Sequence, residues 1–206
     1  GKEVLFNGAH DGWVLDTVFS VNGDHLVTVS RDRSMKLINV PTQRFIDNVT
    51  SITPGALKGG LNSVDRHPTK DELLCGGADG VPKVYKMFRD KARKIGDDFN
   101  LIRAYPALQG RIFSTQFSKD GTKVVSGSSF NGVGQVKVAN YEDGKELSSV
   151  DLDGGIFSVA FHPNGNTVAA AGFGGEVHLI EAATGKIIKS FVPVTIQTAV
   201  VGAAEE

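Results

Sequence analysis

The chain has 206 residues, a formal net charge of −1 and 40% hydrophobic residues. That length suits one sizeable domain or an array of small units, and the near-neutral charge excludes a global field that would recruit nucleic acid or an anionic membrane. The single cysteine, Cys75, excludes an internal disulfide framework and a multi-cysteine metal site. The most apolar stretch, residues 191–204, is broken by proline and polar residues and falls short of the roughly 20 apolar residues of a spanning helix, so we expect no membrane insertion.

The chain begins with a short sequence motif that recurs twice nearer the C-terminus. Gly1-Lys2, Gly144-Lys145 and Gly185-Lys186 are each followed by an alternating run typical of a strand. Glycine in this position is a turn residue, and the first copy lacks the front half of its turn. We therefore interpret the sequence as a segment of a longer protein.

Four segments align with one another, and they are residues 13–39, 60–86, 111–140 and 155–181. Each begins with an alternating strand, passes through a turn such as SKDG or HPNG, and enters a strand of small residues such as VVSGS or VAAAG. A third alternating strand follows, and a Gly-Lys or similar turn leads to a fourth. No stretch carries a convincing amphipathic helix with caps. Short strands at regular spacing, repeated four times, predict an all-β repeat architecture.

This pattern resembles the WD40 repeat, which has an F-S-P-D-G turn, a small-residue strand and an aspartate before its third strand. The resemblance spans residues 1–192. It implies an all-β, WD40-type β-propeller fragment of four four-stranded antiparallel blades plus one orphan outer strand, in which each blade buries its faces only against its neighbours. The expected parts are an orphan strand (1–10), blade 1 (11–50), blade 2 (51–107), blade 3 (108–151), blade 4 (152–192) and a linker or tail (193–206).

The run EVLF at residues 3–6 is expected to form the outermost strand of a preceding blade. The last blade already has an outer strand of its own at residues 187–191, so the leading strand is surplus. We therefore expect the C-terminal part of a larger propeller, with sheet faces and edges exposed at both end blades. Such faces also predict self-association through the end blades.

Blades of this family often contain a buried hydrogen-bonded network of His, Ser or Thr, Asp and Trp. Blade 1 matches it at His10, Thr28 and Asp32, and blade 2 keeps only Asp79. We interpret these four residues as structural, because a buried pair with its hydrogen bonds made is a satisfied core feature. A leucine stands at the His position of the other three blades (Leu57, Leu108 and Leu152).

The sequence contains no recognisable catalytic constellation. His67 and His162 precede proline in equivalent turns, and no HExxH, GxSxG or phosphate-binding loop occurs. Cys75 lies in a core strand, where a structural thiol is expected. We therefore expect a protein that is not an enzyme, with no metal and no cofactor. The alternative is a propeller-type metal-dependent hydrolase or lactonase with a site at the channel mouth. However, the residues before the four first strands are not metal ligands (Trp13, Gly60, Arg111 and Gly155).

The first candidate partner-binding surface is the rim where the first and third strands begin. Aromatic residues and arginine are the types enriched at binding hot spots. The loop residues expected on this rim are Asp11, Trp13, Arg31, Arg33, Arg111, Phe130, Asn131 and Phe173. For Trp13 and Phe173 the alternative is packing between adjacent blades, and for the arginines it is simple solvation.

The second candidate is a basic insertion at residues 86–98, between the third and fourth strands of blade 2. Arg89, Lys91 and Arg93 are its candidate partner-binding residues, beside Lys86 and Lys94. A hairpin of this kind could dock an acidic partner or another domain. The alternative is a solvated hairpin whose charges pair locally. Without a series of stacked aromatic residues, the basic residues do not predict nucleic-acid binding.

The favoured function is a non-catalytic scaffold for protein–protein or domain–domain interaction, with a protein or a neighbouring domain of the same parent chain as its partner. Residues 82–114 and the run FVPV are also similar to WD40 segments of large planctomycete-type bacterial proteins that carry a c-type cytochrome domain. That resemblance implies a periplasmic or extracytoplasmic protein. Without it, a cytoplasmic location is expected.

Overall fold

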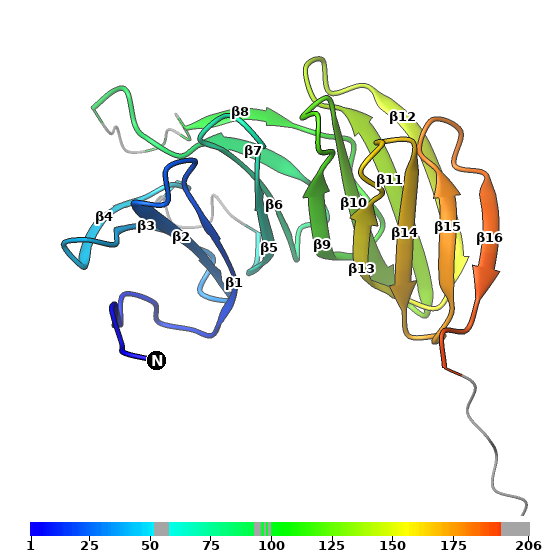
Figure 1. The fold of residues 1–206 in the computed structure, drawn as a ribbon, viewed down its shortest axis with the longest axis horizontal. Helices are drawn as coiled ribbons and strands as arrows, with labels where there is room; N and C mark the ends of the chain where they lie inside the picture. Colours follow the sequence, from blue (N-terminus) through cyan, green and yellow to red (C-terminus); the bar gives the residue numbers. More distant parts are fainter. Residues whose placement is uncertain (52–57, 93–95, 97, 99, 195–206) are drawn as a thin grey trace, which may run out of the picture.

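Four antiparallel sheets of four strands each make up the computed structural model of the chain (Figure 1). The structure describes residues 1–51, 58–92, 96, 98 and 100–194. All regular secondary-structure elements within these residues are β-strands. The described residues form no helix that is long and apolar enough to cross a membrane. The predicted all-β architecture of four four-stranded antiparallel blades is thus confirmed.

In every blade the strands lie side by side in chain order, from the innermost first strand to the outermost fourth. Blade 1 contains β1 (Val14–Phe19), β2 (His25–Ser30), β3 (Met35–Asn39) and β4 (Arg44–Asn48). Blade 2 contains β5 (Leu61–Arg66), β6 (Glu72–Gly77), β7 (Lys83–Lys86) and β8 (Leu101–Ala104). Blade 3 contains β9 (Arg111–Phe117), β10 (Lys123–Phe130), β11 (Val133–Asn140) and β12 (Glu146–Asp153). Blade 4 contains β13 (Ile156–Phe161), β14 (Thr167–Gly172), β15 (Val177–Glu181) and β16 (Ile187–Phe191).

The orphan outer strand expected at residues 3–6 is not formed. Residues 1–13 contain no strand, and the side chains of Val4 and Phe6 are 68% and 79% exposed. A strand needs a neighbour to receive its backbone hydrogen bonds, and none of the four described sheets includes this run.

Small residues in the second strands let neighbouring blades approach closely. A Cβ atom on Gly76 of β6 would lie 2.5 Å from Ile112 Cγ2 of β9, and one on Gly127 of β10 would lie 2.7 Å from Val159 Cγ1 of β13. Larger side chains at these two positions would force the close-packed sheets apart.

The hydrophobic core is divided into layers, each between two successive blades. One buried cluster joins blades 1 and 2 and includes Val29 and Leu61. A second joins blades 2 and 3 through residues such as Leu74 and Phe117, and a third joins blades 3 and 4. Each blade is therefore stabilised mainly by its neighbours, as expected of a repeat array.

The four innermost strands, β1, β5, β9 and β13, lie next to one another in that order. β1, β5 and β9 each have, at equivalent positions, a residue whose side-chain oxygen accepts a hydrogen bond from a backbone N–H of the next innermost strand. The pairs are Asp16 with Val64 N–H (2.9 Å), Ser63 with Thr115 N–H (3.0 Å) and Ser114 with Val159 N–H (3.1 Å).

Candidate protein-interaction surface

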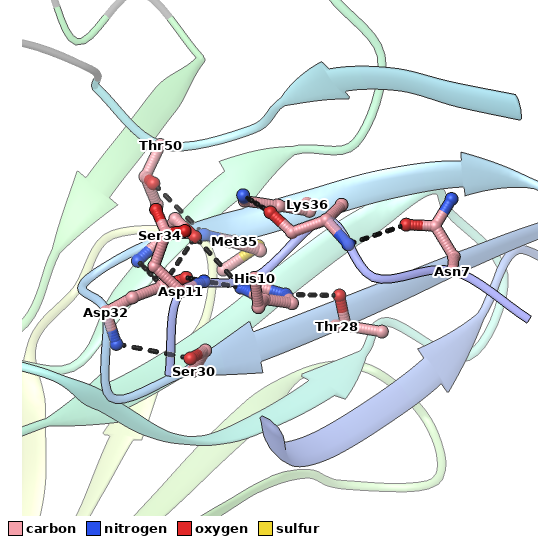
Figure 2. A network of polar contacts seen from close by, with 11 residues as sticks. Asn7, His10, Asp11, Thr28, Ser30, Asp32, Ser34, Met35, Lys36 and Thr50 are labelled. Atoms are coloured by element: carbon pink, nitrogen blue, oxygen red, sulfur yellow. Dashed lines mark hydrogen bonds and ion pairs between the residues drawn. The ribbon is translucent and has the colours of Figure 1, made fainter. Parts of the chain in front are cut away.

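His10 is the centre of a buried polar network in blade 1 (Figure 2). Its Nδ1 lies 2.8 Å from Asp32 Oδ2, and its Nε2 lies 2.7 Å from Thr28 Oγ1. Ser34 extends the network, because its hydroxyl donates a hydrogen bond to Asp32 Oδ1 at 2.6 Å. The structure thus brings together residues from the segment before β1, from β2 and from the β2–β3 turn.

The network holds Asp32 in its charged form. Burial by itself raises the pKa of this carboxyl group, but hydrogen bonds from Ser34, from His10 and from the backbone N–H groups of Asp11 and Ser34 outweigh burial and lower the pKa to about 2. Sequence reasoning missed Ser34. The available signal was its place two residues after Asp32, where its N–H donates to Asp32 Oδ1 at 2.9 Å in an Asx-type turn.

Blade 2 contains two separate polar pairs in place of this network. Asp79 forms an ion pair with Lys83, which sequence reasoning did not anticipate. The buried Tyr85 hydroxyl donates to Asp98 Oδ2 at 2.9 Å, and burial raises the pKa of Tyr85. Leu57, the residue expected at the His position, lies outside the described residues.

Blade 4 has a hollow where blade 1 has its network. Thr28 pairs with Lys36 in blade 1, and the equivalent pair in blade 4 is Ala170 with His178. Glycine at position 174 takes the place of Asp32, so no side chain fills the space. The hollow measures about 280 Å³ and is lined by Ile156, three glycines and the ionisable residues Asp153, Glu176 and His178.

The polar lining of this hollow is acidic. His178 Nδ1 lies 2.7 Å from Ser190 Oγ, and its Nε2 lies 3.8 Å from the carboxylate of Glu176. Asp153 is exposed, and its carboxylate has no hydrogen-bond partner among the described residues. Two carboxylates beside an exposed turn therefore favour a cationic ligand.

The end of each blade where its first strand begins also carries the turn between its second and third strands, and we call this end the Trp13 rim. Trp13, Phe130 and Phe173 on this rim are 72%, 52% and 82% exposed. The Arg31 guanidinium lies 5.1 Å from the centre of the Trp13 ring, which is a cation–π geometry. Neither Trp13 nor Phe173 is packed between described blades. The other predicted charged residues of the rim are also exposed, namely Asp11, Arg33 and Arg111.

The described residues of the basic insertion, 86–92, 96 and 98, lie between β7 and the outer strand β8 of blade 2. Lys86 Nζ is 2.7 Å from Asp90 Oδ2, and Arg89 Nη1 is 3.3 Å from Asp47 Oδ2 in blade 1. Lys91 is exposed, and Arg93 lies outside the described residues. Because two of these cations already have carboxylate partners, the Trp13 rim is the stronger candidate surface.

The remaining reactive side chains lie apart from that rim or within the core. His67 is 4% exposed, and its ring centre lies 5.3 Å from that of Phe117; burial lowers its pKa. Cys75 is 1% exposed, and burial raises its pKa to about 12. Among the described residues, no three His, Cys, Asp or Glu side chains gather closely enough to hold a metal ion.

The structure thus contains four-stranded blades that contact one another through their innermost strands, and blade 1 contains a His–Asp–Thr network. The family model for the WD domain, G-beta repeat, matches residues 1–39 and 144–181. These residues cover the first three strands of blade 1 and the run from the β11–β12 turn to β15. Within these two ranges the chain therefore contains sequence that matches the WD40 repeat.

Two known proteins illustrate the similarity. The chain is 28% identical over 117 residues to eukaryotic translation initiation factor 3 subunit I of Mycosarcoma maydis, a match that covers 48% of this chain and 32% of that protein. The crystal structure of the computationally designed Ika8 protein matches with a TM-score of 0.71 and 20% identity, over 91% of this chain and 52% of that one. The chain thus spans about a third of the curated relative and about half of the designed protein, and the latter shares its fold.

Proposed function

We propose that the chain is a non-catalytic scaffold that binds a protein, or a neighbouring domain of its parent chain, through the Trp13 rim. The observation that carries the proposal is that three large apolar side chains on this rim are exposed to solvent. They are Trp13 just before β1, Phe130 at the end of β10 and Phe173 in the β14–β15 turn. Full burial of a large apolar side chain contributes about 1.5–3 kcal/mol, so three of them can supply the centre of an interface. The resemblance to the WD40 repeat also implies binding to a protein, although fold alone does not establish function.

The residues that line the hollow in blade 4 indicate which side chains a partner would place there. Asp153 and Glu176 supply two carboxylates, and Phe173 belongs to the same β14–β15 turn as Gly174. A lysine or arginine side chain would bring the opposite charge to the hollow, while an apolar neighbour would cover the Phe173 ring. The partner segment therefore carries a basic residue beside an apolar one.

The test begins with peptides selected from a random library against the 206-residue chain, with affinities measured by biolayer interferometry. Phe173→Ala is expected to weaken binding at least about tenfold, because about 1.4 kcal/mol corresponds to a factor of ten. Glu176→Gln should weaken binding and reduce its dependence on salt concentration.

Val21→Ala is the matched control. Val21 is 48% exposed and lies in the β1–β2 turn, at the opposite end of blade 1, so its truncation should leave the affinity unchanged. Peptides that bind Phe173→Ala as tightly as the wild-type chain, or that lose as much affinity with Val21→Ala, would overturn the proposal.

The narrower placement of the chain, in a large planctomycete-type bacterial protein with a c-type cytochrome domain, stays a prediction, as does the extracytoplasmic location that it implies. Neither of the relatives described above bears on it. The test is the coding DNA on both sides of this segment: a CxxCH motif in the same reading frame would support the placement, and a flanking frame without one would contradict it.

A further inference from the structure

The turn between the second and third strands begins in the same way in blades 1, 2 and 4. In each of them the residue just after the second strand donates its N–H to the carbonyl oxygen of the residue just before the first strand. The pairs are Arg31 with Trp13 (3.1 Å), Ala78 with Gly60 (2.9 Å) and Phe173 with Gly155 (2.9 Å). The next position in the turn holds Asp32 in blade 1 and Asp79 in blade 2, but Gly174 in blade 4. Blade 4 therefore lacks the carboxylate that the other two turns have.

The aspartate at this position accepts backbone N–H groups. Asp32 accepts the N–H of Ser34 through Oδ1 at 2.9 Å and that of Asp11 through Oδ2 at 2.9 Å (Figure 2). In blade 2, Asp79 Oδ1 accepts the N–H of Val81 at 3.1 Å. The carboxylate is thus the acceptor for one N–H of the turn itself and, in blade 1, for one N–H of the segment that leads into the first strand.

Blade 3 supplies an acceptor for the second of these N–H groups from another residue. Gln109 directly follows the His position of blade 3, as Asp11 does in blade 1. Its N–H donates to Gln135 Oε1 at 3.0 Å, and the same carboxamide donates through Nε2 to Asp151 Oδ1 at 2.8 Å. A primary carboxamide in the chain therefore accepts this N–H and at the same time donates to a carboxylate.

In blade 4 both equivalent N–H groups lack an acceptor. They belong to Asp153 and Glu176, and neither has a hydrogen-bond partner among the residues that the structure describes. The sheet explains this for Asp153. Because the Gly154 N–H donates to Gly132 O at 2.9 Å, the neighbouring Asp153 N–H points away from β11, and β12 is the outermost strand of its blade. Asp153, Gly174 and Glu176 all line the hollow of about 280 Å³.

The lining of the hollow selects among possible ligand groups. Two unpaired N–H groups require an oxygen acceptor, and the ammonium of lysine and the guanidinium of arginine have none. A carboxylate has the acceptor, but its charge would be repelled by the side chains of Asp153 and Glu176. A primary carboxamide is neutral, and its NH₂ group can donate to a carboxylate, as that of Gln135 does to Asp151. The carboxamide is therefore the group that satisfies both the donors and the acceptors of the hollow.

We propose that the hollow in blade 4 is a binding site for a primary carboxamide, the side-chain group of asparagine and glutamine. The carboxamide oxygen accepts the N–H groups of Asp153 and Glu176, in the place that the Asp32 carboxylate takes in blade 1, and its NH₂ donates to the Glu176 carboxylate. The exposed Asp153 carboxylate stays available for the basic residue of the partner segment. As part of that segment the carboxamide residue rests on the proposed function, whereas binding of a free carboxamide does not.

The first experiment titrates the isotope-labelled 206-residue chain with propionamide and follows backbone amide chemical shifts. The N–H resonances of Asp153 and Glu176 should move downfield, because each gains a hydrogen-bond acceptor. Butanone and propionate are controls of nearly the same shape: butanone has the oxygen but no N–H donor, and propionate is negatively charged. Each should bind at least about tenfold more weakly than propionamide. Equal binding of the three probes, or shift changes that spare both resonances, would overturn the proposal.

A second test needs no ligand. A Cβ on Gly174 would meet only the Asp153 carbonyl oxygen, at 3.7 Å, so the turn accommodates a side chain. Gly174→Asn places a carboxamide at the position of Asp32, and it should move both N–H resonances downfield in the free chain and abolish propionamide binding. Gly174→Ala is the matched control, since it adds a Cβ without an acceptor and should not move them downfield. Gly174→Asn resonances that coincide with those of Gly174→Ala would contradict the proposal.

Glu176→Gln tests the contact with the NH₂ group. It should weaken propionamide binding at least about fivefold and leave butanone binding unchanged, because butanone donates no hydrogen bond to the carboxylate. An equal loss for both probes would overturn the assigned orientation.

The two proposals fail separately. A chain that does not bind propionamide, but whose selected peptides lose affinity with Phe173→Ala, would overturn this inference and support the proposed function. Propionamide binding at Asp153 and Glu176 without any peptide binding at the Trp13 rim would support this inference and overturn the proposed function.

Discussion

Replacing Asp32 by asparagine keeps the shape of the side chain but removes the negative charge from the blade 1 network. The pKa of Asp32 is about 2 in the folded protein, against an ordinary value of 3.8. Folding therefore favours the charged carboxylate, and the difference corresponds to about 2 kcal/mol of unfolding free energy at neutral pH. Loss of this amount is comparable to leaving one buried polar partner, in this case His10, without its charged hydrogen-bond acceptor.

The lowered pKa of Asp32 also predicts how the stability difference between Asp32→Asn and the wild type changes with pH. Because the folded-state pKa is lowered, the stabilisation is complete above the unfolded value near pH 4 and is lost as the pH falls towards 2. In urea denaturation, Asp32→Asn should be about 2 kcal/mol less stable than the wild type at pH 7, and the gap should narrow between pH 4 and pH 2. A gap that stays constant over this range, or that is absent at pH 7, would refute the electrostatic account of the network.

Three other predictions concern packing and burial. Gly127→Val should lower the free energy of unfolding by about 1–3 kcal/mol, because the added atoms meet Val159 and Ile156. Gly174→Ala is the control and should change the free energy of unfolding by less than about 0.5 kcal/mol, because its Cβ would meet only the Asp153 carbonyl oxygen, at 3.7 Å. Tyr85→Phe should cost about 1 kcal/mol in the same urea assay through loss of the hydrogen bond to Asp98, and an unchanged midpoint would count against that bond. Cys75 should react with a thiol reagent only after unfolding, because its thiol is buried and its pKa is about 12; rapid labelling of the native chain would contradict this burial.

Much of the fold was predictable from the sequence because the signals are local and repeated. The alternating first strands and the small-residue second strands recur in register, and the structure places all four blades where those runs predict them. Residues 3–6 have the same alternating pattern but form no strand, because strand formation also depends on a neighbour. A local pattern contains no information about that neighbour.

The polar features were predictable only in part. His10, Thr28 and Asp32 are recognisable from the family pattern, and the structure places them within hydrogen-bonding distance. The hollow in blade 4 was not anticipated, because it depends on the lack of a side chain at Gly174 and on the three-dimensional register of Ala170 with His178. The hydrogen bonds between innermost strands were also missed, since they join residues about 50 positions apart.

The most direct test of partner binding at the Trp13 rim is a titration of the isotope-labelled chain with a selected peptide, followed by backbone amide chemical shifts. We expect the largest shift changes in the β10–β11 and β14–β15 turns, around Phe130 and Phe173, with smaller changes near Trp13. Shift changes confined to the opposite ends of the blades, around His67 and His162, or to the basic insertion at Lys91, would contradict binding at the Trp13 rim.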